Sequence, residues 1–161
     1  MEANFNNISN FLVPLSLFSL KWRFIDPKHN ILPDNDIKKL KPLNGLASQF
    51  LDQYAKTNLY SDFPFNNGLF TQIDFIDFNG NNKTQIEEWL LKWGLNSKQE
   101  VYLSWDKNLA MIIPFGILVK YFDDFHYPSS DDLIVFQKEL QWALLFFHTG
   151  RIYYGYKKFN N

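Results

Sequence analysis

Three histidines are the side chains best suited to acid–base chemistry near neutral pH, because an imidazole titrates there. They are His29, His126 and His148, and none of them belongs to an H-E-x-x-H pair or a similar short metal-binding spacing. The chain has no cysteine, so it can form neither a disulfide nor a thiolate ligand or nucleophile. The sequence therefore predicts no metal and no cofactor, and it contains no recognisable catalytic motif.

One enzymatic interpretation combines two of these histidines with a phenol and an ammonium group. His126, His148, Tyr153 and Lys157 together carry the groups that a metal-independent ribonuclease uses for general acid–base catalysis. The competing interpretation is structural, with His148 at the end of a hairpin strand, Tyr153 packed on a sheet and Lys157 in a solvated tail. We favour the structural interpretation and keep the ribonuclease as an alternative function.

The segment from Arg151 to Phe159 interleaves basic and aromatic residues. Such a mixture can stack single-stranded bases on a sheet, so an RNA-binding module is a second alternative. The formal net charge of −1 and the pI near 6.3 argue against it, and only two of the sixteen basic residues are arginines, which grip phosphate better than lysines. We therefore do not expect nucleic acid as the main partner.

Carboxylates recur in pairs beside aromatic residues, a composition that suits a surface for a basic protein. Aromatic residues make up 19% of the chain, more than an average core requires, so some rings are expected at the surface. The carboxylates would steer a basic partner and the rings would anchor it, although the same carboxylates could simply solvate loops. The predicted binding residues are Asp74, Asp77, Asp123, Asp124, His126, Tyr127, Asp131 and Asp132.

The last third of the chain predicts the sheet that would position several of these residues. Leu133–Phe136, Trp142–Phe147 and Ile152–Tyr156 are three β-prone runs. The short Thr149–Gly150 step between the last two suits a hairpin turn. These segments together predict an antiparallel meander.

Two earlier segments alternate apolar and polar residues, which indicates half-buried strands. The first is Lys21–Ile25, and the second lies within Leu69–Phe78. In the second strand Ile73 and Phe75, with Phe78 as a further candidate, form the apolar side that alternates with Asp74 and Asp77.

Helices are predicted between the strands by capping residues and apolar stripes. Asn44 can cap a helix, and Thr84 begins another that carries Trp89 and Trp93 on one face. Pro114 can open a third helix. The apolar stripe of the first helix consists of Leu46, Ala47, Phe50, Leu51 and Tyr54.

Strands that cluster with helices between them, without regular βαβ alternation, predict an α+β fold. We expect a mainly antiparallel sheet with a C-terminal meander, covered by several helices. No linker or repeat divides the sequence, so one domain over residues 1–161 is expected. The apolar run Phe11–Leu20 follows Glu2 rather than a basic segment and is too short to span a membrane, so the sequence predicts a cytoplasmic protein with no membrane partner.

The overall pattern resembles the immunity proteins of bacterial contact-dependent growth inhibition and related small α+β proteins. The resemblance covers about half of the chain and contains no catalytic signature. It implies a cytosolic protein, not an enzyme, that binds the C-terminal nuclease domain of a cognate toxin and blocks its activity. The segments that carry it are Lys21–Phe24, Asp36–Leu43, Phe115–Phe125, Asp131–Phe136 and Phe146–Tyr153.

Overall fold

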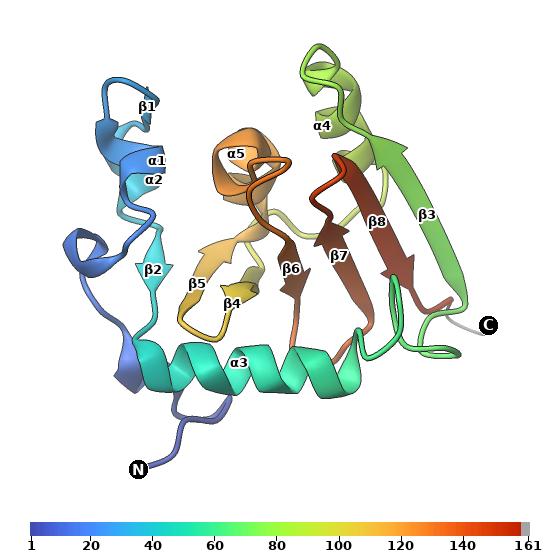
Figure 1. Cartoon of the computed structure of the whole chain (residues 1–161), viewed down its shortest axis with the longest axis horizontal. Helices are drawn as coiled ribbons and strands as arrows, with labels where there is room; N and C mark the ends of the chain where they lie inside the picture. Colours follow the sequence, from blue (N-terminus) through green and yellow to red (C-terminus); the bar gives the residue numbers. More distant parts are fainter. Residues whose placement is uncertain (159–161) are drawn as a thin grey trace.

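Seven strands form one open antiparallel sheet in residues 1–158, the part of the chain that the computed structural model describes (Figure 1). The strand order is β2-β5-β4-β6-β7-β8-β3. This sheet, covered by helices, confirms the predicted α+β fold. The strands are β2 (Lys41–Pro42), β3 (Gln72–Asp77), β4 (Glu100–Asp106), β5 (Leu109–Pro114), β6 (Leu133–Phe136), β7 (Trp142–Phe146) and β8 (Arg151–Tyr156), and the short β1 (Asn30–Ile31) lies outside the sheet.

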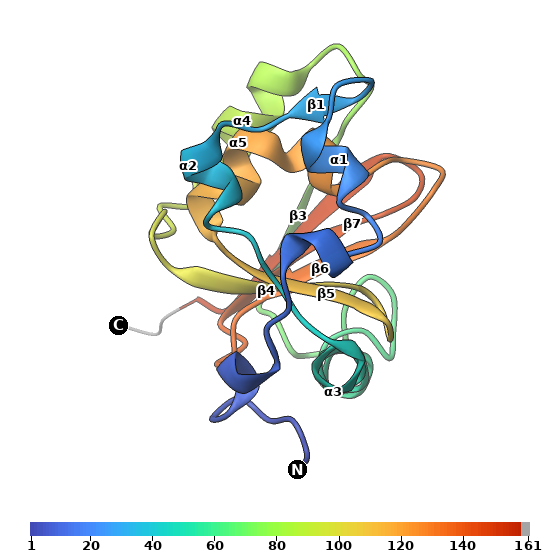
Figure 2. The same cartoon turned by 90° about the vertical axis from the view of Figure 1, so that its left-hand side faces the viewer.

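Helices cover both faces of the sheet, which gives three layers (Figure 2). Helix α3 lies across the strands on one face, and the other helices lie on the opposite face. The helices are α1 (Trp22–Ile25), α2 (Asp34–Ile37), α3 (Gly45–Asn58), α4 (Lys83–Leu91) and α5 (Phe115–Phe125), preceded by 3-10 turns at Ile8–Phe11 and Leu15–Leu17.

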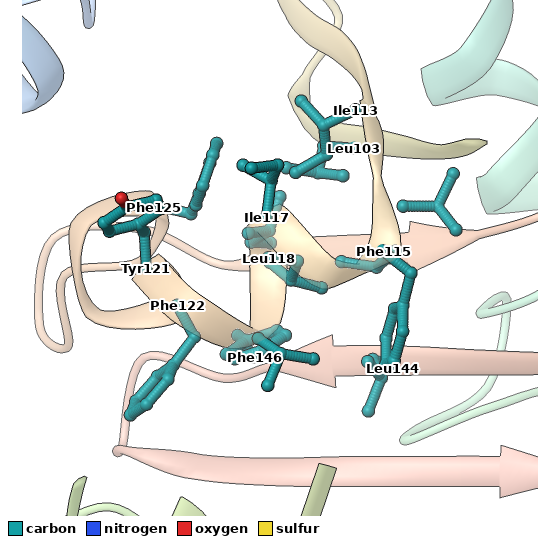
Figure 3. Packing of buried hydrophobic residues seen from close by; sticks show 14 of the residues in the cluster. Leu103, Ile113, Phe115, Ile117, Leu118, Tyr121, Phe122, Phe125, Leu144 and Phe146 are labelled. Atoms are coloured by element: carbon teal, nitrogen blue, oxygen red, sulfur yellow. The ribbon is translucent and has the colours of Figure 1, made fainter. Parts of the chain in front are cut away.

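The larger core lies between the sheet and helix α5, as Figure 3 shows. Pro114 stands at the N-terminus of α5, and Phe115, Leu118 and Phe122 from the same helix are buried against the strands. Trp89 of α4 is buried in this core as its helical spacing predicts. Burial of this apolar surface is the main force that holds the helices on the sheet.

The smaller core lies between the sheet and α3. The side chain of Asn44 accepts a hydrogen bond from the Ala47 amide at 3.1 Å, which confirms the predicted N-cap. Ala47, Leu51 and Ala55 are fully buried, and the small alanines allow the helix axis to lie close to the sheet. The prediction for Leu46 was wrong, because that side chain is on the solvent side of the helix.

The C-terminal meander has the predicted strands and turn. β6 pairs with β7, and β7 pairs with β8 so that Phe146 lies opposite Ile152. Gly150 in the turn has a φ of 95°, a left-handed conformation that glycine adopts without strain. The predicted strand at Lys21–Ile25 is wrong: its last four residues form helix α1, because Arg23 and its neighbour Phe24 are both buried, whereas a strand would direct them to opposite faces.

Strand β3 is an edge strand in the described part of the chain, and two apolar residues of its alternating pattern are not buried. Ile73 and Phe75 are 49% and 51% exposed, whereas Ile76 and Phe78 pack against the larger core. Ile73 and Phe75 lie on the face of the sheet that carries α3, but α3 packs on the central strands and does not reach the edge. The alternating pattern therefore located the strand correctly, although Ile73 and Phe75 do not face the core.

Candidate functional site: an acidic cleft with an aromatic rim

A cleft of about 300 Å³ opens between the C-terminal half of α3, the loop that follows it, the β4–β5 turn and strands β6 and β7. Four carboxylates line it and Lys56 is the cation among its lining residues. Three aromatic side chains form part of the remaining wall. We call it the acidic cleft; its carboxylates are Asp52, Asp62, Asp106 and Asp132, and its rings are Tyr60, Phe63 and Phe147. Trp105 also borders the cleft, but its ring packs on the other face of the sheet against Phe18 and Phe125.

The loop after α3 is held in place by one asparagine. Asn66 accepts hydrogen bonds from the amide and the hydroxyl of Ser61 at 2.6 and 2.8 Å, and its side-chain amide donates to the Thr57 carbonyl at 3.1 Å. Phe65 is buried and lies edge-on to Phe70 with 5.1 Å between ring centroids. These contacts fix the segment that brings Tyr60, Asp62 and Phe63 to the cleft.

The electrostatic character of the cleft is visible in the pKa of Tyr60. Burial, together with the smaller effect of the negative charges of Asp52 and Asp132, raises this pKa to about 12. Asp52 is itself buried, and its Oδ2 accepts from Lys56 Nζ at 2.8 Å, one helical turn away. Tyr60 therefore keeps its proton at physiological pH and presents a neutral hydroxyl beside the carboxylates.

Ser104 lines the cleft from strand β4, and its hydroxyl is buried without a hydrogen-bond partner in residues 1–158. Its strand partners are Ala110 of β5 and Ile134 of β6, which are apolar. The β4–β5 register shifts between Ser104 and Asp106, and such bulges redirect side chains at the ends of strands. A polar atom left unpaired in an apolar layer is costly, so Ser104 is unusual for this position.

Exposed and half-buried rings continue from the cleft toward the edge of the sheet and form what we call the aromatic rim: the exposed Phe63 and Phe75 and the half-buried Phe147 and Tyr153. The ring of Phe63 lies 4.8 Å from that of Phe147 and 5.3 Å from that of Tyr153, measured between centroids. Phe63 is 59% exposed, and Phe75 belongs to the edge strand β3. Arg151 covers the Phe75 ring at 4.1 Å and forms two hydrogen bonds to Asp77, at 2.7 and 3.0 Å.

The structure places one of the predicted binding residues in the acidic cleft and one beside the aromatic rim. Asp132 lines the cleft, where its Oδ1 accepts from the backbone amide of His148 at 2.7 Å and lies 3.0 Å from the His148 imidazole. Asp77 lies beside the aromatic rim. Asp131 is next to the cleft but forms an ion pair with the buried Arg23 at 2.6 Å. Tyr127 packs on the same guanidinium at 4.2 Å.

The remaining predicted residues lie elsewhere and already have partners within the fold. Asp123 pairs with Lys83 at 3.0 Å, and Asp124 accepts from the Asn30 side chain at 2.8 Å. Asp74 pairs with Lys92 on the face of β3 opposite Asp77. Burial raises the pKa of Asp124, so its charged form is disfavoured. The eight predicted residues therefore do not form one continuous surface.

The groups of the ribonuclease alternative are not brought together. His126 is buried, its Nε2 donates to the Asp131 carbonyl at 2.7 Å, and burial lowers its pKa. Lys157 follows the far end of β8, six residues long, whereas His148 precedes its start. At about 3.3 Å per residue these two groups are roughly 20 Å apart. Phe159, the last residue of the basic and aromatic segment, lies outside the described residues.

Most residues of the acidic cleft were missed in the sequence. Asp52 and Lys56 were concealed in the helical pattern of α3, and Asp62 and Phe63 lie in a loop without a motif. Ser104 interrupts an otherwise apolar stretch of β4, and that polar residue at a buried strand position is the one signal that could have marked the site.

Comparisons of the chain with protein-family models, with curated proteins and with solved structures find no match. Within residues 1–158 no helix is both long and apolar enough to cross a membrane. Across the same residues, no group of three or more histidine, aspartate or glutamate side chains is arranged to hold a metal ion. The class that the fold and the cleft define is thus an α+β protein with an acidic, aromatic surface cleft.

Proposed function

We propose that this protein binds and neutralises a basic protein in the cytoplasm, in the manner of an immunity protein that blocks the nuclease domain of a contact-dependent growth inhibition toxin. The observation that carries the proposal is the acidic cleft beside the aromatic rim. Nuclease domains hold phosphate with lysines and arginines, so their surfaces are complementary to a cleft of this kind. The protein has no catalytic role in this proposal.

The charge that attracts the partner must be local. The whole chain carries only −1, whereas the lining of the acidic cleft has four carboxylates and one ammonium group. At physiological ionic strength such a charge acts over about 8 Å, so it orients a partner at close range. Exposed rings such as Phe63 then supply the apolar contact area that anchors the complex.

Strand addition is a second way in which the partner can engage the same protein. The open edge belongs to β3, because β3 covers β8 of the meander. The Phe78 amide donates to Gly150 of the β8 side, so alternate residues, including Ile73, direct their amides toward the open edge. A partner strand could pair there, and its affinity would depend on backbone hydrogen bonds rather than on charge.

The proposed function predicts that the gene immediately upstream encodes a toxin, and it is tested by co-expression with the C-terminal domain of that toxin. That domain alone should arrest growth, and this protein should restore growth and form a stable complex with it in size-exclusion chromatography. Expression of this protein alone should be harmless, whereas a ribonuclease would injure the cell that makes it. Persistent growth arrest in the presence of this protein, with no complex, would refute the proposal.

The mode of binding is tested with two charge changes of the same sign. Asp132→Lys alters the acidic cleft, and Ile73→Lys places a lysine on the edge strand outside the aromatic rim, where it opposes strand pairing. If charge dominates, Asp132→Lys should slow association and reduce its dependence on salt, while Ile73→Lys has a smaller effect. The reverse order of effects, with affinity indifferent to salt, would favour strand addition.

A further inference from the structure

We propose that the acidic cleft accepts one arginine side chain from the basic partner, with the guanidinium group held by the carboxylates and by the Ser104 hydroxyl. This inference rests on the proposed function and specifies how the partner is recognised. Three features of the cleft carry it: its charge, its unpaired hydroxyl and its size.

The first feature is the charge of the cleft, whose carboxylates retain unused acceptor atoms. Asp62 and Asp106 are exposed and form no ion pair within residues 1–158. Asp52 uses one oxygen for Lys56, and its other oxygen accepts no hydrogen bond in the described chain. A cation with several donor groups would donate hydrogen bonds to these acceptors. Such charge-assisted hydrogen bonds are stronger than hydrogen bonds between neutral groups.

The Ser104 hydroxyl is the second feature and is independent of the charge. Ser104 lines the cleft, and its buried Oγ has no partner in the described residues, although its strand neighbours Ala110 and Ile134 show that an apolar side chain would suit this layer. An alanine here would avoid the cost of an unpaired polar atom. A serine at this position makes sense where a bound group supplies the missing hydrogen bond.

Size and shape favour arginine over a longer segment or a lysine. Ligand pockets span roughly 300 to 1,000 Å³, so a cleft of about 300 Å³ has room for a single side chain. Its walls include the rings of Tyr60, Phe63 and Phe147, and the flat guanidinium group stacks on such rings while it donates five hydrogen bonds in a fixed fork. A lysine ammonium group can use neither the planar stacking nor the fork.

The test uses short blocked peptides and does not require the partner. Acetyl-Gly-Arg-Gly-amide should shift the backbone amide signals of Ser104, Tyr60 and Asp132 in two-dimensional NMR, with a Kd on the order of 1 mM, as expected for a fragment of this size. The lysine peptide should bind about tenfold more weakly, and the uncharged citrulline peptide should leave these signals in place. Lysine and arginine peptides of equal affinity, or arginine shifts outside the cleft, would overturn the inference.

Two variants separate the contacts from the fold. Asp52→Asn should weaken binding of the arginine peptide by about tenfold and Ser104→Ala by about threefold, consistent with the loss of a charged and a neutral partner. Ser104→Ala removes the unpaired hydroxyl, so its melting temperature should be unchanged or higher, which rules out misfolding as the cause. Glu100→Gln is the matched control, because Glu100 is exposed and lies at the opposite end of β4. Unaltered affinity in both cleft variants would contradict the proposal.

A further arm distinguishes a protein side chain from a small molecule. Agmatine carries the same guanidinium group without a peptide backbone, and it should bind no more tightly than the arginine peptide. Agmatine binding more than tenfold tighter would assign the cleft to a small cation and refute the protein source. The inference is also separable from the proposed function: a Ser104→Ala/Asp52→Asn protein that restored growth and bound the toxin domain with unaltered affinity would refute this inference and leave the proposed function standing.

Discussion

Replacement of Gly155 by alanine should destabilise the fold by about 1–3 kcal/mol, the usual cost of forcing one extra methyl group into a packed core. A Cβ atom at Gly155 would lie 2.3 Å from Cδ2 of Phe70 and 2.9 Å from two further atoms of that ring. Gly155 does not adopt a left-handed conformation, so a steric clash rather than backbone strain is what alanine adds. Phe70 is 8% exposed and lies edge-on to Phe65, so its ring has little room to retreat.

The free energy of unfolding is measured by urea denaturation followed through tryptophan fluorescence. Gly45→Ala is the matched control, because Gly45 opens α3 with no atom within 4 Å of an added Cβ, and alanine there should be neutral or stabilising by up to about 1 kcal/mol. Phe70→Ala alone should cost about 3–5 kcal/mol. Combined with Gly155→Ala it should cost less than the sum of the two single changes, because the clash has been removed.

The reasoning fails if Gly155→Ala unfolds within about 0.5 kcal/mol of the wild type, the range of an ordinary surface substitution. Strict additivity with Phe70→Ala would refute it as well. A further consequence concerns the candidate site, because Phe70 and Phe65 close the loop that carries Tyr60 and Phe63. The clash should therefore also shift the backbone amide signals of residues 60–66, which Gly45→Ala should leave unchanged.

Three further outcomes follow from individual side chains. Trp89→Ala should cost about 3–5 kcal/mol, whereas Leu91→Ala on the exposed side of the same helix should cost under about 1 kcal/mol; equal losses in urea denaturation would contradict this. Because burial lowers the pKa of His126, its contribution to stability should be complete above the ordinary value of 6.5 and be lost as the pH falls below it; His126→Gln should flatten this part of the denaturation profile, and an unchanged slope would refute the assignment. In an NMR titration, Asp132→Asn should lower the pKa of Tyr60 from about 12 but keep it above the ordinary value of 10, because burial is the larger cause. An unchanged pKa of Tyr60 would show that the charge of Asp132 does not act on its hydroxyl.

The sequence predicts the fold class well because local signals and tertiary packing agree in most of the chain. The capping residue Asn44 and the glycine of the β7–β8 turn each satisfy a backbone requirement that has few other solutions. The failures occur where a local pattern is at odds with long-range packing. At Lys21–Ile25 both Arg23 and Phe24 are buried, and Arg23 pairs with Asp131, 108 residues away, a contact that has no local signature.

The candidate site was less predictable because it is assembled from four separate segments. Asp52 comes from a helix, Asp62 from a loop, Asp106 from the end of strand β4 and Asp132 from the position just before strand β6. Their spacing in the sequence reflects chain topology rather than chemistry, so no sequence motif could predict that these four carboxylates lie together. The prediction of an acidic and aromatic surface captured the kind of chemistry in the cleft and, of its carboxylates, included Asp132.

Aspartates that look equivalent in the sequence differ in whether the fold has already used their charge. Asp74, Asp77, Asp123 and Asp131 each pair with a lysine or arginine, so each contributes little net field to an approaching partner. Only carboxylates that form no ion pair within the fold leave their negative charge available for recognition of a partner. In the acidic cleft Lys56 offsets one of the four carboxylates, so the remaining negative charge is concentrated beside the exposed ring of Phe63. The position of the unpaired charge, rather than the number of acidic residues, is therefore the reason that the proposed function assigns partner binding to this end of the sheet.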